Sequence, residues 1–513
     1  MVLEKVQEFT LWQLLAQRVN QTPNLPMLIN GEIEGEVLTF KACFDKAQSL
    51  AAGLQQQGIK PGDVVAWQFP TGPEAIILSL ALSRLDVIQN PVLHLYQGRE
   101  LVDILSQSVP QWVIVPASSE DASYATRVSS VLDESTLDAA MLVLEAEFYV
   151  SDISALPEHS IENNKVRWIY CTSGTTSGPK GVLHTDASLI AGGYGLATAM
   201  GTTVDDTGSI AYPYAHIGGS MYLVMVLMMG IPVVLLKRFQ VEVAAEIFRK
   251  YGVTLAGGST AHYQAWLELQ RRNPGQPVVP SMRILAGGGA SKPPHLYFDL
   301  KAEMGVTVLH AYGMTESPLV AHNSPSNTEY QLAHTEGQPI PSMELRIQKS
   351  DGSEAVTDEE GEILIRGACL CKGYVSSEET AAAFDASGFY HTGDLGRLDE
   401  ANCLTISGRL KDIIIRKGEN IAAREIEEIL SQHPNVGQVA VVGLPDESRG
   451  EMVCAIFEAD CLPITLTEMT AYLADAGLMK QKWPERLECV PAFPRSEALG
   501  KISKKDIKQL FVS

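Results

Sequence analysis

The stretch IYCTSGTTSGPKGVLHT, residues 169–185, holds the densest set of chemically useful side chains in the chain. Hydroxyl residues and glycines follow an apolar run directly, and a single lysine, Lys180, comes after them. Glycine lets the backbone approach a ligand closely and lysine offsets negative charge, so the combination suits a phosphate chain. The P-loop pattern needs Ser or Thr after its lysine, whereas Gly181 stands here. The stretch therefore predicts a phosphate cradle that is not of the Walker type, with an ordinary Ser/Gly loop as the alternative.

Two later apolar segments also run into loops of unusual composition. MRILA, residues 282–286, precedes three consecutive glycines, and VTVLH, residues 306–310, precedes AYGMTES. In open α/β sheets, ligands bind beyond the carboxyl ends of the strands. Three strand ends of this kind predict one shared crevice.

Several side chains near these loops and farther along are suited to a nucleotide. Tyr312 can stack on a base, Thr315 can bond a phosphate, and Glu316 can hold Mg²⁺, which prefers oxygen ligands. Asp394 can accept hydrogen bonds from both ribose hydroxyls, and Lys501 lies on a glycine-flanked stretch near the end. Taken singly, each has an ordinary reading as a capping, turn or surface residue. Their order along the chain is what favours a nucleotide site.

The elements that must position these residues are read from composition and periodicity. The 513 residues are too many for one core, and 45% hydrophobic with 19% charged residues is ordinary for a globular protein. Up to about residue 165, helical patterns alternate with short apolar strands, which is typical of βα units on parallel sheets. From about residue 345, short alternating segments predict hairpins and a small barrel-like lobe, and a βα pattern restarts after Lys411. We therefore expect an α/β fold with a boundary near Lys411.

Three further features bound the function. The net charge of −22 opposes nucleic acid or an anionic membrane as the main partner. The most apolar run, residues 221–236, is short for a membrane span and is broken by Gly230 and Pro232, so it predicts a buried helix, a turn and a buried strand. The eight scattered cysteines include no CxxC pair and are expected to be reduced thiols of a cytoplasmic protein, as no signal peptide opens the chain.

Five motifs, in order, carry a resemblance to a known superfamily: TSGTTSGPKG, YGMTE, HTGDLGRL, GRLKDIIIRKGENI and LGKI. They resemble the core motifs of the adenylate-forming enzymes, which include acyl-CoA synthetases, luciferases and nonribosomal-peptide adenylation domains. The resemblance spans about residue 170 to the C-terminus. It implies a large N-terminal domain of βα sheets plus a barrel-like lobe, residues 1–410, and a smaller, mobile C-terminal α+β domain, residues 411–513. One departure is Ala423, where the family often has proline.

The resemblance also implies a role for each matching residue. The ATP phosphates would be held by Thr172, Ser173, Gly174, Thr175, Thr176 and Lys180. Adenine would meet Tyr312 and Gly287, Gly288 and Gly289, while Thr315 would touch the α-phosphate and Glu316 would bind Mg²⁺. Asp394 and Arg409 would grip the ribose, Lys411 would be the hinge, Gly418 would line the pantetheine tunnel, and Lys501 would be the adenylation lysine.

The segment PYAHIGG, residues 213–219, aligns with the acyl pocket of the superfamily. It has Ala215 where an aromatic residue is common, and His216 rather than a carboxylate lies where amino-acid-activating members bind the substrate ammonium. A buried ammonium without a partner is costly, so an α-amino acid is disfavoured. His216 could also be an ordinary core histidine. The predicted pocket consists of Tyr214, Ala215, His216, Gly218, Gly219, Gly313 and Met314, with His216 also a catalytic candidate.

The prediction for function is an ATP-dependent carboxylic acid:CoA ligase that works through an acyl-adenylate. The motifs look most like bacterial ligases for medium-chain, alicyclic or steroid-derived acids. ATP, Mg²⁺ and coenzyme A are the expected cofactors and substrates, with no nucleic acid and no membrane span, and a homodimer is left open. Two alternatives remain: an enzyme that loads an acyl or aryl acid onto a carrier protein, and a non-catalytic binder or an oxidative enzyme of the luciferase type.

Overall fold

The computed structural model describes residues 8–33, 35–117, 123–172, 178–416, 419–446, 448–458, 464–495 and 502–511. These form two compact units, of which the first comprises residues 1–344 and 366–388 and the second residues 345–365 and 389–513. The expected boundary at Lys411 lies inside the second unit and stays a prediction about the domains. The segments expected to form the barrel-like lobe, from about residue 345, thus belong mostly to the same unit as the C-terminal residues.

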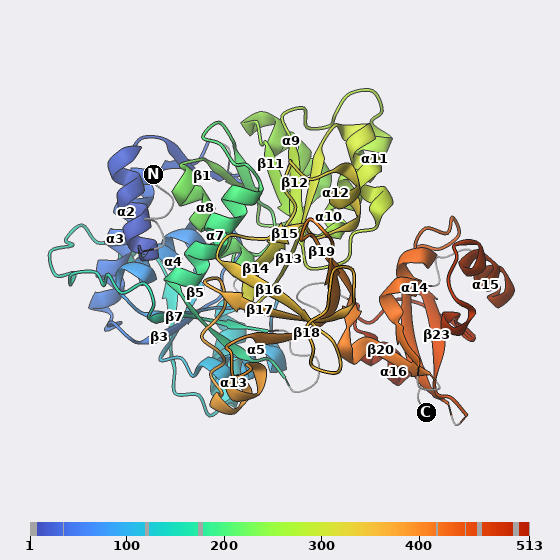
Figure 1. The fold of residues 1–513 in the computed structure, drawn as a ribbon. Coiled ribbons are helices and arrows are strands. Elements are labelled where there is room, and N and C mark those ends of the chain that lie inside the picture. Colours follow the sequence, from blue (N-terminus) through green and yellow to red (C-terminus); the bar gives the residue numbers. More distant parts are fainter. Residues whose placement is uncertain are drawn as a thin grey trace. The chain divides into compact units, whose positions relative to one another are not determined.

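The first unit contains two sheets (Figure 1). The six-stranded sheet has the order β6 (Ala140–Leu144), β5 (Trp112–Pro116), β3 (Val64–Trp67), β4 (Ile88–Pro91), β7 (Val166–Cys171), β8 (Gly181–Thr185). The nine-stranded sheet has the order β15 (Gln338–Pro339), β14 (Ser317–His322), β13 (Thr307–Met314), β12 (Ile284–Gly288), β11 (Leu255–Gly258), β9 (Gly208–Ile210), β10 (Val233–Leu235), β1 (Pro26–Asn30), β2 (Val37–Thr39). Most neighbours are parallel, as the alternating βα pattern predicts. The antiparallel pairs are β7–β8, β13–β14, β14–β15 and β1–β2.

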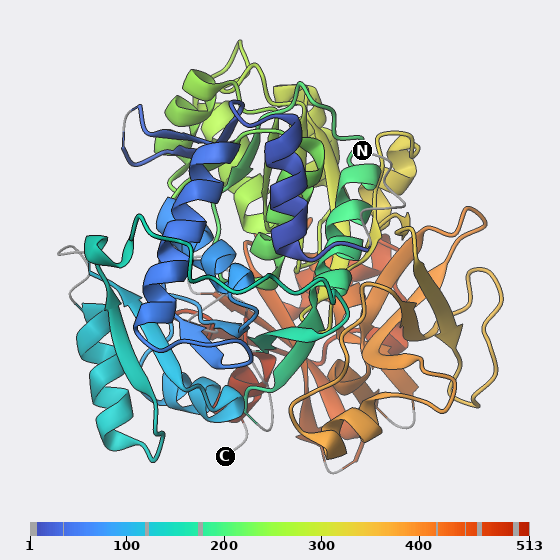
Figure 2. The ribbon, with the colours of Figure 1, turned by 90° about the vertical axis from the view of Figure 1, so that its left-hand side faces the viewer.

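Helices between the two sheets build the core of this unit. They are α2 (Leu11–Gln21), α3 (Phe40–Gln56), α4 (Pro73–Arg84), α7 (Asp186–Ala199) and α8 (Ile217–Met229), which pack on one another (Figure 2). The outer helices are α5 (Gly98–Ser108), α6 (Ser123–Glu134), α9 (Val241–Tyr251), α10 (Thr260–Arg272), α11 (Pro294–Met304), α12 (Glu329–His334) and α13 (Ser377–Ala383). Contacts of α7 with β7 and β14 link the two sheets.

Helix α8 and strand β10 confirm the interpretation of the most apolar run. Almost every side chain of α8 is buried, because this helix is apolar on all faces and lies inside the unit. It ends at Gly230, whose φ of 72° lies in the left-handed region that glycine adopts freely. Among the described residues, no helix is long and apolar enough to cross a membrane.

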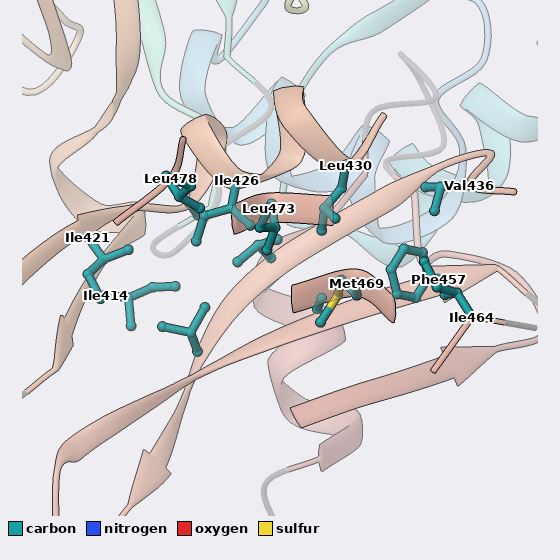
Figure 3. Packing of buried hydrophobic residues seen from close by; sticks show 14 residues of the cluster. Ile414, Ile421, Ile426, Leu430, Val436, Phe457, Ile464, Met469, Leu473 and Leu478 are labelled. Atoms are coloured by element: carbon teal, nitrogen blue, oxygen red, sulfur yellow. The ribbon is translucent and has the colours of Figure 1, made fainter. Parts of the chain in front are cut away.

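The second unit contains a four-stranded and a five-stranded sheet. The first runs β16 (Met343–Gln348), β17 (Gly361–Gly367), β18 (Tyr390–Leu398), β19 (Leu404–Arg409). The second runs β21 (Glu419–Ala422), β20 (Ile413–Arg416), β23 (Gly450–Glu458), β22 (Val439–Asp446), with β24 (Arg486–Val490) also on β23. The helices α14 (Ala423–Leu430), α15 (Leu466–Asp475) and α16 (Lys504–Phe511) accompany it. Figure 3 shows the buried cluster that Ile426, Leu430, Met469 and Leu473 form with strand residues such as Phe457.

Candidate active site

The two ends of the predicted phosphate loop are clasped together. Strand β7 ends at Cys171, which pairs with Gly181 at the start of β8. The Thr172 N–H donates to the Lys180 carbonyl at 3.0 Å, and the Lys180 N–H donates to Thr172 Oγ1 at 3.2 Å. The loop therefore leaves and re-enters the sheet at one point. Four predicted phosphate ligands, Ser173, Gly174, Thr175 and Thr176, lie outside the described residues.

Lys180 is held by two side chains from a distant part of the chain. Its Nζ is 3.2 Å from Glu379 Oε1 and 5.1 Å from the centre of the Tyr374 ring. The side chains of Lys180 and Glu379 are about one-third exposed, at 35% and 31%. A cation in this setting is accessible to an anionic ligand, and the ligand must compete with Glu379.

Thr315 and Glu316 form the turn between β13 and β14, where Met314 pairs with Ser317. The Thr315 carbonyl is 2.7 Å from His184 Nε2, and His184 Nδ1 is 2.9 Å from Ser188 Oγ. Because a carbonyl only accepts, the ring proton is on Nε2 and Nδ1 accepts from the Ser188 hydroxyl. Burial lowers the pKa of His184 to about 4, so the ring is neutral at pH 7. A buried, uncharged histidine thus fixes the backbone of Thr315.

The carboxylate of Glu316 is nearly buried and accepts a hydrogen bond from the Tyr374 hydroxyl, with 2.7 Å between Oη and Oε1. Within the described ranges, no group of three or more His, Cys, Asp or Glu side chains could hold a metal ion. Mg²⁺ is commonly bound by one or two carboxylates together with substrate phosphates and water. A single carboxylate at Glu316 therefore fits a Mg²⁺ that arrives with a nucleotide.

The first two of the three consecutive glycines end β12 and lie beside β13, the strand that carries Tyr312. Gly287 pairs with His310 and Gly288 with Ala311. A Cβ on Gly287 would be 1.8 Å from the Gly258 carbonyl oxygen, and one on Gly288 would be 2.3 Å from that of Ala311. The strands thus approach too closely for any side chain, which gives a packing reason for both glycines. Tyr312 is 6% exposed, and its predicted contact with adenine stays a prediction, as does that of Gly289.

A small recess, partly open to solvent, lies at the meeting point of β7, α8 and the turn after β13. Its lining is Pro91, Val92, Leu93, Tyr96, Ile104, Tyr170, Cys171, Ala215, His216, Ile217 and Thr315. No Asp, Glu, Lys or Arg belongs to this lining of described residues. The recess therefore suits an uncharged, largely apolar group that ends near Thr315.

The residues predicted for the acyl pocket divide into two sets. Ala215 and His216 line the recess, and His216 Nδ1 accepts from the Gly218 N–H at 3.1 Å at the start of α8. Five others do not line it: Tyr214, Gly218, Gly219, Gly313 and Met314. Tyr214 is buried against Trp67, and a Cβ on Gly219 would be 2.2 Å from the Tyr214 carbonyl oxygen. Gly219 therefore has a packing reason for its identity, and its role in an acyl pocket stays a prediction.

In the second unit, Asp394 and Arg409 are direct partners across the β18–β19 hairpin. Arg409 Nε is 3.0 Å from Asp394 Oδ1. The pKa of Lys411, which lies in a short 3₁₀ helix after β19, is lowered by partial burial and by Arg409. Gly418 and Lys501 lie outside the described residues. The ribose, hinge, tunnel and adenylation roles assigned to these residues stay predictions.

A model of the AMP-binding enzyme family matches residues 15–375, which is more than half of the chain, and one of its C-terminal domain matches residues 425–501. The chain is an AMP-binding enzyme. The predicted resemblance and fold class are confirmed. The chain is similar to the medium-chain fatty-acid–CoA ligase of Escherichia coli, at 28% identity over 92% of this chain and 85% of the relative.

Further comparisons show the range of the relatives. A 2-succinylbenzoate–CoA ligase of Bacillus cereus is 29% identical over 97% of this chain and 98% of its own, and a salicyl-AMP ligase/salicyl-S-ArCP synthetase of Mycobacterium tuberculosis is 29% identical over 92% and 85%. The o-succinylbenzoate CoA synthetase of Bacillus subtilis, solved with its acyl-adenylate, has a TM-score of 0.83 at 26% identity and covers 97% and 98% of the two chains. The same enzyme has been solved with ATP and magnesium ion.

Three residues at the site of this AMP-binding enzyme were not predicted from sequence: His184, Tyr374 and Glu379. His184 lies within residues 169–185, but nothing in its neighbours along the chain indicates a partner 131 residues away. Tyr374 and Glu379 lie in GYVSSEET, a segment without helical or strand periodicity, 58 or more residues beyond Glu316. Only the tertiary structure identifies them.

Proposed function

We propose that this AMP-binding enzyme is a carboxylic acid:CoA ligase that forms an acyl-adenylate from acid and ATP and then transfers the acyl group to coenzyme A. One observation carries the proposal: Tyr374 contacts both Lys180 and Glu316, next to the point where Thr172 and Lys180 close the predicted phosphate loop. A cation, a magnesium-competent carboxylate and a phosphate loop in one place suit attack on a polyphosphate. The enzymes named as CoA ligases among its relatives support the choice of reaction.

In the first step, a carboxylate oxygen attacks the α-phosphorus of ATP and pyrophosphate leaves. Two anions approach each other, so the protein must supply positive charge and hydrogen-bond donors where negative charge develops. Lys180 and Thr172 would hold the phosphates that leave, and Thr315 would hold the α-phosphate. Mg²⁺, held by Glu316, would supply neutralisation of phosphate charge.

In the second step, the thiol sulfur attacks the acyl carbonyl, the thiol loses its proton, and AMP leaves. No nucleophilic side chain is needed in either step, because the adenylate is itself the activated intermediate. The thiol of Cys171, which lines the recess, is no candidate nucleophile, since burial raises its pKa to about 12. The chain's part is to orient reactants and to keep charge balanced.

We propose a medium-chain, alicyclic or steroid-derived acid as the substrate. The uncharged lining of the recess supports an apolar reactant next to Thr315, and it offers no carboxylate to pair an ammonium group. A second candidate is the loading of an acyl or aryl acid onto a carrier protein, which the salicyl-AMP ligase/salicyl-S-ArCP synthetase among the relatives favours. The homodimer and the cytoplasmic location stay predictions.

The test is pyrophosphate release across a panel of carboxylic acids, each with and without free coenzyme A. A CoA ligase should release AMP and form a thioester only when CoA is present. Acid-dependent pyrophosphate release without any AMP release on addition of CoA would favour the carrier-loading enzyme. No pyrophosphate release with any acid would refute acid adenylation.

A further inference from the structure

Residues 371–375, here called the bridging segment, connect the strand after the phosphate loop with the turn that carries Glu316. Four backbone hydrogen bonds join it to both sides: Cys371 N–H to Glu316 O (2.8 Å), Lys372 N–H to Leu183 O (2.8 Å), Leu183 N–H to Gly373 O (2.9 Å) and Val375 N–H to Gly181 O (2.8 Å). The segment thus lies beside β8 and pairs with it in antiparallel fashion over a few residues. It fixes the position of Glu316 relative to the residue after Lys180.

Tyr374 is the side chain of this segment that touches both charged groups. Its hydroxyl donates to Glu316 Oε1 at 2.7 Å, and its ring lies 5.1 Å from Lys180 Nζ. The side chain is 5% exposed, and its backbone N–H donates to Thr380 Oγ1 at 2.8 Å at the start of α13. Phenol, ring and backbone are therefore each held by a separate contact.

We propose that Tyr374 is a positioning residue, which orients the Glu316 carboxylate for Mg²⁺ while its ring supports the Lys180 ammonium. The inference rests on the proposed function, since it assigns Glu316 to the metal and Lys180 to the phosphates. A phenol donor to a carboxylate is a charge-assisted hydrogen bond, which is stronger and more directional than a neutral one. It engages Oε1, so the orientation of the carboxylate is set before the nucleotide arrives.

The decisive variant is Tyr374→Phe, which keeps the ring beside Lys180 and removes only the hydroxyl. Calorimetric titration with ATP in the presence of Mg²⁺ should show affinity weakened about tenfold, the scale of a lost hydrogen bond to a charged group. Titration with ATP in EDTA should change less than twofold, because Lys180 keeps its surroundings. Tyr297→Phe, at another buried tyrosine of the first unit, is the matched control and should leave both affinities unchanged.

A double-mutant cycle with Glu316→Gln separates positioning from general damage. If Tyr374 acts through Glu316, then Tyr374→Phe should have no further effect on Mg²⁺-dependent affinity once Glu316 is Gln. Independent effects of the two substitutions would overturn the inference, and so would equal losses with Mg²⁺ and with EDTA. These binding titrations need no acid, so a failure of acid adenylation would refute the proposed function and leave the role of Tyr374 to be decided by the cycle.

Discussion

Acid should destabilise the first unit through His184. The ring is fully buried, donates from Nε2 to the Thr315 carbonyl and accepts at Nδ1 from Ser188, so protonation would place an uncompensated charge in the core. Burial lowers the pKa of this side chain from 6.5 to about 4. Above pH 6.5, His184 is neutral in both the folded and the unfolded chain. In that range it contributes no pH dependence to the free energy of unfolding.

Between pH 6.5 and about 4, the unfolded chain binds a proton that the folded chain does not, so the free energy of unfolding falls as the pH falls. A pKa difference from 6.5 to about 4 corresponds to about 3 kcal/mol, at ~1.4 kcal/mol per tenfold change in binding. Below about pH 4 both states are protonated and the contribution no longer changes. Against total stabilities of about 5–15 kcal/mol, a loss of this size is easily measured.

The assay is urea unfolding at a series of pH values from 7.5 to 4.5, followed by tryptophan fluorescence. Trp67, Trp168 and Trp266 are fully buried in the first unit and report its unfolding. In His184→Gln, an amide donor and acceptor replace the two ring nitrogens, and the side chain cannot titrate. As the pH is lowered, the free energy of unfolding of this variant should therefore fall by about 3 kcal/mol less than that of the wild type. His334→Gln, at an exposed residue of α12, controls for the substitution itself. Parallel pH dependences of wild type and His184→Gln would refute the reasoning.

Three further predictions concern charge and space at the site. Glu379→Gln removes the counter-ion 3.2 Å from Lys180, so ATP affinity measured by calorimetry should rise up to about fivefold, and weaker binding would contradict this. Ala215→Phe should narrow the recess and raise the KM for bulky acids about tenfold with little change for CoA, whereas the reverse pattern would assign the recess to the thiol. Lys501→Ala should slow acyl-AMP formation by about 10² to 10³ and spare thioester formation from supplied acyl-AMP, with Lys508→Ala as the unaffected control. Normal adenylation by Lys501→Ala would remove that residue from the mechanism.

Local sequence patterns predicted the strands that carry the site. Apolar runs followed by glycine-rich or polar loops correspond to β7, β12 and β13, because a buried strand must end where polar residues begin. The hairpins expected from about residue 345 include the one formed by β18 and β19, in which Asp394 pairs with Arg409. These features depend on residues close in the chain, which is why a single sequence indicates them.

Contacts between distant segments could not be predicted in this way. The single crevice was expected from strand ends of similar composition, yet β7 belongs to one sheet and β13 to another, and the His184 hydrogen bond to Thr315 and the Tyr374 hydrogen bond to Glu316 bring them together. The basic C-terminal tail gives a second example. Lys504 forms an ion pair of 2.7 Å with Glu427 in the second unit, a contact that no charge count along the tail indicates.

The arrangement around Lys180 suggests how a chain of net charge −22 could receive the polyanion that the proposed function requires. A strongly positive surface patch is one way to attract phosphate, but here the lysine already has an anionic partner in Glu379 and an aromatic one in Tyr374. A phosphate that binds Lys180 therefore exchanges one ion pair for another instead of creating a new one. Because the number of ion pairs at Lys180 is conserved in the exchange, this lysine adds little net attraction, and under the proposed roles the backbone clasp at Thr172 and the fixed carboxylate of Glu316 would supply part of the specificity. Under the proposed function, rigid local geometry at Lys180 would therefore compensate in part for the negative net charge of the chain.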